Sequence, residues 1–270
     1  MEDKLKKKII YELIKTFINA GDIALELRDK GLKKIIKDDN TPVTNGDLEV
    51  NKIITNKLKE ITPEIPIVSE EVSENKNSNS LSTFWLVDPI DGTYDYLNNK
   101  EEFTLNAGLI INKKPDIAII NAPAKKRLFY TFGVNNSFEL KDNAETKLDS
   151  GANSKNKELS ALVYSDNIKG EIKDIHNKYN IKKITKMKSS YKFCTIASGG
   201  FDLYVADPRA SEWDIAAGDA ILRNAGGSVK DMDGNEILYG KKDFKNPSLV
   251  IKSARLLNNC LLYTSPSPRD

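Results

Sequence analysis

The stretch with the clearest capacity for chemistry covers residues 84–93, where an apolar run ends in two carboxylates, a glycine and a hydroxyl. The apolar residues predict a short buried strand, and we expect Pro89 to end it, so that Asp88 and Asp91 lie on the loop that follows. Two buried carboxylates so close would repel each other unless a divalent cation such as Mg²⁺ lay between them. Gly92 lets the backbone approach a ligand closely, and the amides around it can face an anion. The stretch predicts a metal site for phosphate chemistry, although an ordinary strand and Asp-Gly turn would use the same residues.

Further acidic residues accompany this stretch, and each also has a purely structural explanation. Asp47 falls in the first turn of a helix that Thr44 would cap, where the helix dipole favours a carboxylate. Glu70 follows a short predicted strand and could simply face solvent. Asp214 stands three residues after Ser211, which is the position of the acidic partner in a capping box. All of these residues lie at strand ends or helix starts, where folding could bring them to one place.

Hydrophobic periodicity predicts the elements that would carry these residues. Apolar positions three or four apart predict an amphipathic helix over 4–28, and alternating segments between 103 and 132 predict an antiparallel meander. Residues 94–100 are expected to form a loop beside the aspartate pair. A strand, a helix and a strand then follow one another over 159–186, which is typical of an α/β unit. The single histidine, His176, falls on that helix and is expected at the surface.

This change from a predicted meander to alternating strands and helices predicts an α/β protein of two subdomains with the site in the cleft between them. The polar stretch 142–157 is the expected seam, which gives an N-terminal α+β subdomain over 1–155 and a C-terminal α/β subdomain over 156–259. Residues 260–270 match, in order, the translation of a transposase-type sequencing adapter, and their Pro, Ser and Arg content departs from a chain rich in Lys, Asn and Ile. We therefore expect 260–270 to be a non-native tail that packs poorly.

Composition restricts the kind of partner. Of the 270 residues, 39% are hydrophobic and 30% charged, and the formal net charge is +2. These values suit a globular protein and provide no general attraction for nucleic acid. No apolar run is long enough to cross a bilayer and no signal peptide opens the chain, so we expect a cytoplasmic location, with peripheral membrane contact left open. Without the tail one cysteine remains, Cys194, in agreement with a reducing compartment. Monomer and homodimer both remain open.

The blocks together resemble the inositol monophosphatase superfamily of magnesium-dependent, lithium-sensitive phosphomonoesterases. The blocks that match, in order and spacing, are Glu70-Glu71, Asp88-Pro89-Ile90-Asp91-Gly92-Thr93 and Trp213-Asp214-Ile215-Ala216-Ala217-Gly218. Within the superfamily the chain is most similar to bacterial CysQ-type 3'(2'),5'-bisphosphate nucleotidases, through residues 39–44, 68–71 and 189–194. The resemblance implies a layered α-β-α-β-α sugar-phosphatase fold. It also implies removal of the 3'-phosphate from adenosine 3',5'-bisphosphate to give AMP.

The resemblance further implies a role for each matching residue. Two or three Mg²⁺ ions would be held by Glu70, Asp88, the carbonyl of Ile90, Asp91 and Asp214. Asp47 would accept a hydrogen bond from Thr93, whose hydroxyl would orient a metal-bound water for in-line attack, and Glu70 would share in the catalysis. Lys192 would bind the second phosphate of the nucleotide. The full set of substrate contacts would be Asp91, Gly92, Thr93, Ser189, Ser190, Lys192 and Asp214.

Two departures from the nucleotidase pattern leave the substrate open. The usual Lys-Glu-Phe after the Asp-Gly-Thr is replaced by Tyr94-Asp95-Tyr96, and a segment resembling Ser-Arg-Ser-His is replaced by Ser165-Asp166-Asn167. Both segments would border the leaving group, so an inositol monophosphatase or a sugar bisphosphatase is the alternative. A non-catalytic metal and nucleotide sensor would be expected to lose Thr93 or Asp47 first. A nuclease would need a basic stripe, so the expected partner is a small phosphate ester and not a nucleic acid polymer.

Overall fold

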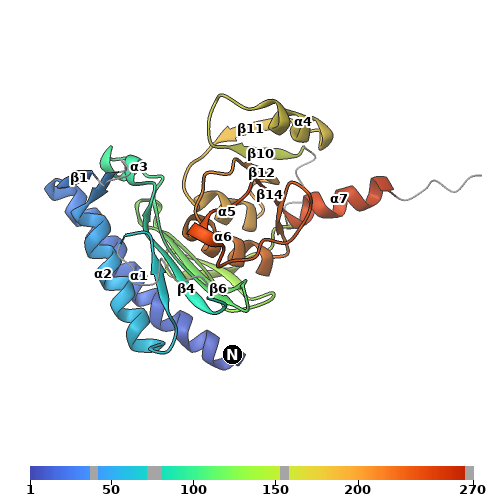
Figure 1. Ribbon diagram of the computed structural model, residues 1–270. Coiled ribbons are helices and arrows are strands. Elements are labelled where there is room, and N and C mark those ends of the chain that lie inside the picture. The colour runs from blue at the N-terminus through green and yellow to red at the C-terminus, as the bar shows by residue number, and fades with distance from the viewer. Residues whose placement is uncertain (37–41, 72–80, 153–157, 265–270) are drawn as a thin grey trace, which may run out of the picture.

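The fold has five layers in the order helix, sheet, helix, sheet, helix (Figure 1). The computed structural model describes residues 1–36, 42–71, 81–152 and 158–264. The helices of the three helical layers, taken from the N-terminal side, are α1 (Asp3–Lys30) with α2 (Asn45–Ile61), α5 (Tyr191–Ala197) with α6 (Glu212–Asn224), and α4 (Gly170–Lys178) with α7 (Ala254–Thr264). This arrangement confirms the predicted α/β class and the layered fold.

The first sheet has seven strands, which lie in chain order from β3 to β9. β3 and β4 are parallel, and every later pair is antiparallel. The strands are β3 (Ile67–Ser69), β4 (Phe84–Asp91), β5 (Thr104–Ile111), β6 (Lys114–Ala122), β7 (Arg127–Thr131), β8 (Ser137–Lys141) and β9 (Ala144–Lys147). The predicted meander is confirmed, and it continues into the stretch expected to be the seam.

Both faces of this sheet are buried, which explains the continuous apolar run in β4. Trp85 and Val87 pack with α1 and α2, whereas Phe84 and Leu86 pack with α5 and α6. Successive side chains of a strand point to opposite faces, so a strand between two helical layers needs apolar residues at every position. Gly108 on β5 allows α6 to lie close to the sheet, because a Cβ there would stand 3.0 Å from the backbone nitrogen of Ala217.

The second sheet has the strand order β11-β10-β12-β14-β13, with β11, β10 and β12 parallel and the others antiparallel. Its strands are β10 (Ser160–Val163), β11 (Lys183–Lys186), β12 (Leu203–Ala206), β13 (Ser228–Asp231) and β14 (Leu249–Lys252). The α/β character predicted for the second half is therefore confirmed. The predicted boundary between residues 155 and 156 lies outside the described residues, so the exact division remains a prediction. The smaller elements are β1 (Lys34–Ile36), β2 (Pro42–Thr44), α3 (Thr93–Leu97), η1 (Pro123–Lys125) and η2 (Lys242–Phe244).

Pro89 does not end its strand, contrary to the sequence prediction. β4 continues to Asp91, and its pairing with β5 shifts register between Asp88 and Asp91. On the other side β3 pairs with β4 only as far as Val87. Pro89 thus lies where the ladder is irregular and one neighbour has already ended, so its missing N–H removes no regular ladder bond.

Two further expectations are wrong for reasons of tertiary packing. Part of the stretch 94–100 is the helix α3, whose Tyr96 is buried, packs on Phe103 at 4.9 Å between ring centroids, and donates its hydroxyl to the carbonyl of Ala24 at 2.6 Å. His176 is buried instead of exposed, because α4 covers the outer face of the second sheet. Neither of its ring nitrogens has a hydrogen-bond partner within the described part of the chain.

The proposed non-native tail begins within a helix. α7 continues through Thr264, and residues 265–270 lie outside the described residues. The origin of residues 260–270 therefore remains a prediction. Across the described residues, no helix combines the length and apolar content needed to span a membrane.

Candidate active site

Three carboxylates from both halves of the protein meet at one point. Oxygens of Glu70, Asp88 and Asp214 all lie within 4.8 Å of one another. Glu70 follows β3 directly, and its N–H donates to the carbonyl of Val87 on β4 at 3.0 Å, which places it beside Asp88. Asp214 comes from the first turn of α6, where it accepts the N–H of Ser211 at 2.7 Å in the predicted capping arrangement. The capping role and the site role of Asp214 are thus compatible.

This acidic cluster fits a divalent cation. Asp88 is 1% exposed, and its Oδ1 has no hydrogen-bond partner among the described residues. Burial raises the pKa of Asp88 well above its ordinary value, and the charges of Glu70, Asp91 and Asp214 raise it further. Carboxylates buried together without a cationic partner are unfavourable unless a proton or a metal ion offsets their charge. Hard oxygen ligands in this number suit Mg²⁺ or Ca²⁺.

Asp91 and Ile90, the other two predicted ligands, make protein contacts in the structure. Asp91 accepts a hydrogen bond from the N–H of Ser190, and the carbonyl of Ile90 accepts one from the hydroxyl of Thr93 at 3.2 Å. Burial raises the pKa of Asp91, and Lys192 opposes that increase. Their roles as metal ligands remain predictions.

Asp47 and Thr93 make the contact that the sequence predicted. Thr93 donates from Oγ1 to Oδ1 of Asp47 at 3.3 Å. The other carboxylate oxygen accepts the N–H of Thr44 at 2.8 Å together with its hydroxyl, so Asp47 also caps α2. Burial raises the pKa of Asp47 to about 6. The turn at Gly92 directly precedes Thr93. Its φ is +95°, and a Cβ there would stand 2.8 Å from the carbonyl oxygen of Glu102, so only glycine fits.

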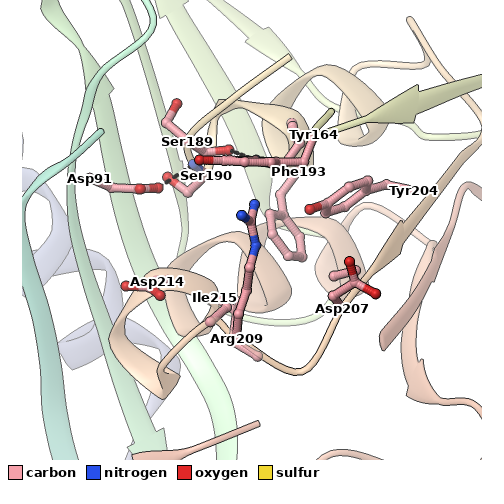
Figure 2. Close-up of a pocket in the computed structure, with 13 residues that line it drawn as sticks. Asp91, Tyr164, Ser189, Ser190, Phe193, Tyr204, Asp207, Arg209, Asp214 and Ile215 are labelled. Atoms are coloured by element: carbon pink, nitrogen blue, oxygen red, sulfur yellow. Dashed lines mark hydrogen bonds between the residues drawn. The ribbon is translucent and has the colours of Figure 1, made fainter. Parts of the chain in front are cut away.

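A cavity of about 280 Å³ opens beside the carboxylates and contains most of the predicted substrate contacts. Figure 2 shows Asp91 and Asp214 on one side of it, with Arg209 extending between them and Tyr204. Lys192 lines the cavity and is 6% exposed, so it is a buried lysine. Burial lowers the pKa of Lys192 to about 8. The cavity therefore has a carboxylate wall and a cationic wall.

Four polar lining residues were missed by the sequence analysis: Tyr164, Tyr204, Asp207 and Arg209. The guanidinium carbon of Arg209 lies 3.2 Å from the ring centroid of Tyr164, and Nζ of Lys192 lies 5.1 Å from that of Tyr204. The same four residues also line a neighbouring cavity of about 270 Å³, whose walls add apolar side chains from β10 and α4. No local signal pointed to them, because Asp207 to Ala210 reads only as a turn and Tyr164 only as the end of a strand.

The fold and the acidic site together define a metal-dependent phosphomonoesterase. The chain belongs to the inositol monophosphatase family, whose model matches residues 5–266. It is 37% identical over 240 residues to the 3'(2'),5'-bisphosphate nucleotidase CysQ of Buchnera aphidicola, covering 86% of this chain and 88% of that one. It is 29% identical over 246 residues to the CysQ of Escherichia coli K12, covering 86% and 95%. The crystal structure of CysQ from Bacteroides thetaiotaomicron superposes with a TM-score of 0.74 at 26% identity, covering 93% and 98%. These findings confirm the resemblance seen in the sequence.

Proposed function

We propose that the protein removes the 3'-phosphate from adenosine 3',5'-bisphosphate. The observation that carries the proposal is that two cations, Lys192 and Arg209, line the same cavity as Asp91 and Asp214, with Asp207 as a further carboxylate. A substrate with one phosphate at the carboxylates and a second at the cations would use both walls. The similarity to several CysQ bisphosphate nucleotidases supports the same substrate class. Guanidinium and ammonium groups are the usual receptors for a phosphate dianion.

In this proposal the metal ions are two or three Mg²⁺, held by Glu70, Asp88, the Ile90 carbonyl, Asp91 and Asp214. The cluster of three carboxylates supports it, as does Oδ1 of Asp88, which has no hydrogen-bond partner among the residues that the structure describes. Bound there, such ions lower the pKa of water and neutralise charge on the phosphate and the leaving oxygen. Glu70 contributes to catalysis by keeping its carboxylate at this cluster, where its backbone N–H to Val87 fixes it.

Asp47 and Thr93 would orient the attacking water. The single proton of the Thr93 hydroxyl lies within reach of both Asp47 and the Ile90 carbonyl, and when it is directed to Asp47 a lone pair of Oγ1 can accept a hydrogen bond from water. The carboxylate of Asp47 can then receive a proton through Thr93, and a pKa of about 6 is suited to that transfer. The amides of Gly92 and Thr93 would hold oxygens of the phosphate. This route uses no histidine, and the buried His176 lies on α4, outside the cavity lining.

The second phosphate would bind Lys192 and Arg209, with Ser189 and Ser190 beside them. The rings of Tyr164 and Tyr204 line both cavities and offer flat apolar surface for the nucleoside. The presence of Asp166 in the segment that departs from the nucleotidase pattern is weaker evidence against a nucleotide substrate than the sequence suggested. Its carboxylate forms an ion pair with Lys186 and is 81% exposed, so it does not line the cavity.

The decisive experiment compares the bisphosphate with the monophosphate that lacks only its second phosphate, and with two substrates of the alternative function. Phosphate release with Mg²⁺ is measured on adenosine 3',5'-bisphosphate, 3'-AMP, inositol 1-phosphate and fructose 1,6-bisphosphate, with Thr93→Ala as the inactive reference. We expect the highest kcat/KM on the bisphosphate. Arg209→Met should lower that value by about 100-fold and the value for 3'-AMP by less than about threefold, as expected for a lost charged contact. Preference for inositol 1-phosphate or the sugar bisphosphate would instead establish the alternative function.

A further inference from the structure

The segment from Lys188 to Ser190 connects the C-terminal half to the carboxylates of the first sheet. It leads into α5, which carries Lys192, so it places several of the proposed phosphate contacts together. Ser189 has φ of +52°, in the left-handed region that non-glycine residues rarely adopt. Such a conformation persists only where surrounding contacts impose it. The contacts that hold this segment are therefore relevant to how the site is assembled.

Ser190 is held by three residues of the first sheet. Its N–H donates to Asp91, and its hydroxyl donates to Oδ1 of Asn106 at 2.8 Å. The same hydroxyl lies 2.8 Å from Oγ1 of Thr104, also on β5. Asn106 and Thr104 are buried. These bonds fix the start of α5 against β4 and β5, but they act on Ser190 alone.

Lys188 is held by two carboxylates of the N-terminal half. Its N–H donates to Oε2 of Glu102 at 3.0 Å, and its Nζ lies 3.3 Å from Oδ1 of Asp95. The side chain of Asp95 is 3% exposed, and the residue sits on α3, two positions after Thr93. Lys100 reaches the same oxygen of Asp95 at 3.4 Å, but it lies in the N-terminal half itself and is 54% exposed. Of these two ion pairs, only the one with Lys188 crosses between the halves.

We propose that Asp95 is a positioning residue: by holding Lys188 it keeps Ser189 and Ser190 against Asp91 and so aligns the phosphate contacts of one half with the carboxylates of the other. Asp95 itself lines neither of the two cavities beside the carboxylates. It acts through an ion pair whose carboxylate is buried while the lysine side chain is 26% exposed, and such a half-buried pair is screened by water and salt less than a fully exposed one. Without it the contacts would remain present but displaced, and small displacements of binding groups have large kinetic effects.

The test uses Asp95→Asn, Lys188→Met and the double variant, with Lys100→Met as the matched control. Lys100→Met removes an ammonium from the same carboxylate oxygen without breaking a contact between the halves. The first measurement is amide hydrogen exchange of peptides covering residues 187–192 in the metal-free protein. We expect exchange about tenfold faster in both single variants, no further increase in the double variant, and wild-type exchange in Lys100→Met. Unchanged exchange in Asp95→Asn would overturn the proposal.

The second measurement is steady-state kinetics with Mg²⁺ and adenosine 3',5'-bisphosphate, since this part rests on the proposed function. The expected change is a rise in KM of about tenfold with kcat altered less than about threefold, the same in single and double variants. If the role of Asp95 were merely structural, its loss would lower the melting temperature and the active fraction without changing KM. Additive effects of the two single substitutions on KM would also contradict the proposed coupling between Asp95 and Lys188. If the wild type does not hydrolyse the bisphosphate, the proposed function fails, and the exchange measurement still decides the role of Asp95.

Discussion

Replacing Asp88 by Asn should stabilise the metal-free protein while abolishing its response to Mg²⁺. Asp88 is buried within 4.8 Å of both Glu70 and Asp214, and the structure gives its Oδ1 no hydrogen-bond partner among the described residues. Two unit charges 4.8 Å apart interact by about 3 kcal/mol at an effective dielectric constant of 20, and by less than about 1 kcal/mol in water. The raised pKa of Asp88 means that proton uptake already relieves part of this repulsion. We therefore expect a gain of about 1–3 kcal/mol in the metal-free state.

The assay is thermal unfolding at pH 7.5 with a chelator, followed by a Mg²⁺ titration. For a chain of this size the gain corresponds to an increase in Tm of roughly 3–10 °C. Mg²⁺ should raise the Tm of the wild type, because it binds the native state only, and should leave Asp88→Asn nearly unchanged. Phosphate release should fall by at least about 100-fold in the variant, since a proposed metal ligand is lost.

Asp219→Asn is the matched control for this experiment. Asp219 is equally buried, but Arg223 and the hydroxyl of Tyr239 satisfy its carboxylate, the latter at 2.7 Å. Breaking a paired buried charge costs about 3–5 kcal/mol, so this variant should lose stability with or without Mg²⁺. The reasoning is refuted if Asp88→Asn lowers the metal-free Tm as Asp219→Asn does, or if Mg²⁺ stabilises Asp88→Asn as strongly as the wild type.

Four shorter predictions concern other parts of the molecule. Asp214→Asn should lower phosphate release by at least about 100-fold with far-UV circular dichroism unchanged, because the amide loses the charge needed for metal binding. Burial lowers the pKa of His176 below its ordinary 6.5, so the unfolded chain binds a proton that the native chain does not, and stability should fall as pH drops below that value. In urea unfolding, the free energy of unfolding of His176→Leu should therefore fall less between pH 7 and pH 5 than that of the wild type. Burial raises the pKa of Cys194, so in a Cys260→Ser background no thiol should react with a disulfide reagent until the protein unfolds. Deleting residues 260–270 should change neither activity nor Tm, and a large loss of either would show that they belong to the protein.

The carboxylates of the site could be predicted from the sequence because their positions are set locally. Asp88 follows the apolar run at the start of β4, Glu70 follows β3, and Asp214 occupies the acidic position of a capping box. Turn chemistry and capping rules act over a few residues, so the sequence alone shows where such side chains will stand. The contact between Asp47 and Thr93 was expected for a different reason, because the resemblance to the inositol monophosphatase superfamily implied it.

The errors of sequence analysis arise where a neighbour in space decides the outcome. Pro89 is compatible with β4 only because β3 has ended and the pairing with β5 is shifted at that point. The burial of His176 depends on the outer face of a sheet whose five strands come from other segments of the chain. Neither fact is encoded in the residues adjacent to the position concerned.

The cationic wall of the cavity shows most clearly why substrate choice is harder to predict than reaction class. Arg209 belongs to a turn and Tyr164 to the end of β10, and they are brought into contact only because β10 and β12 are parallel neighbours. Parallel strands end at the same edge of a sheet, so the residues that follow them converge whatever the distance between them along the chain. The groups proposed to recognise the second phosphate therefore depend on strand order, whereas the carboxylates proposed to hold the metal depend on motifs. A family with one chemistry can therefore change its substrate by altering the residues that depend on strand order, without disturbing the carboxylate motifs.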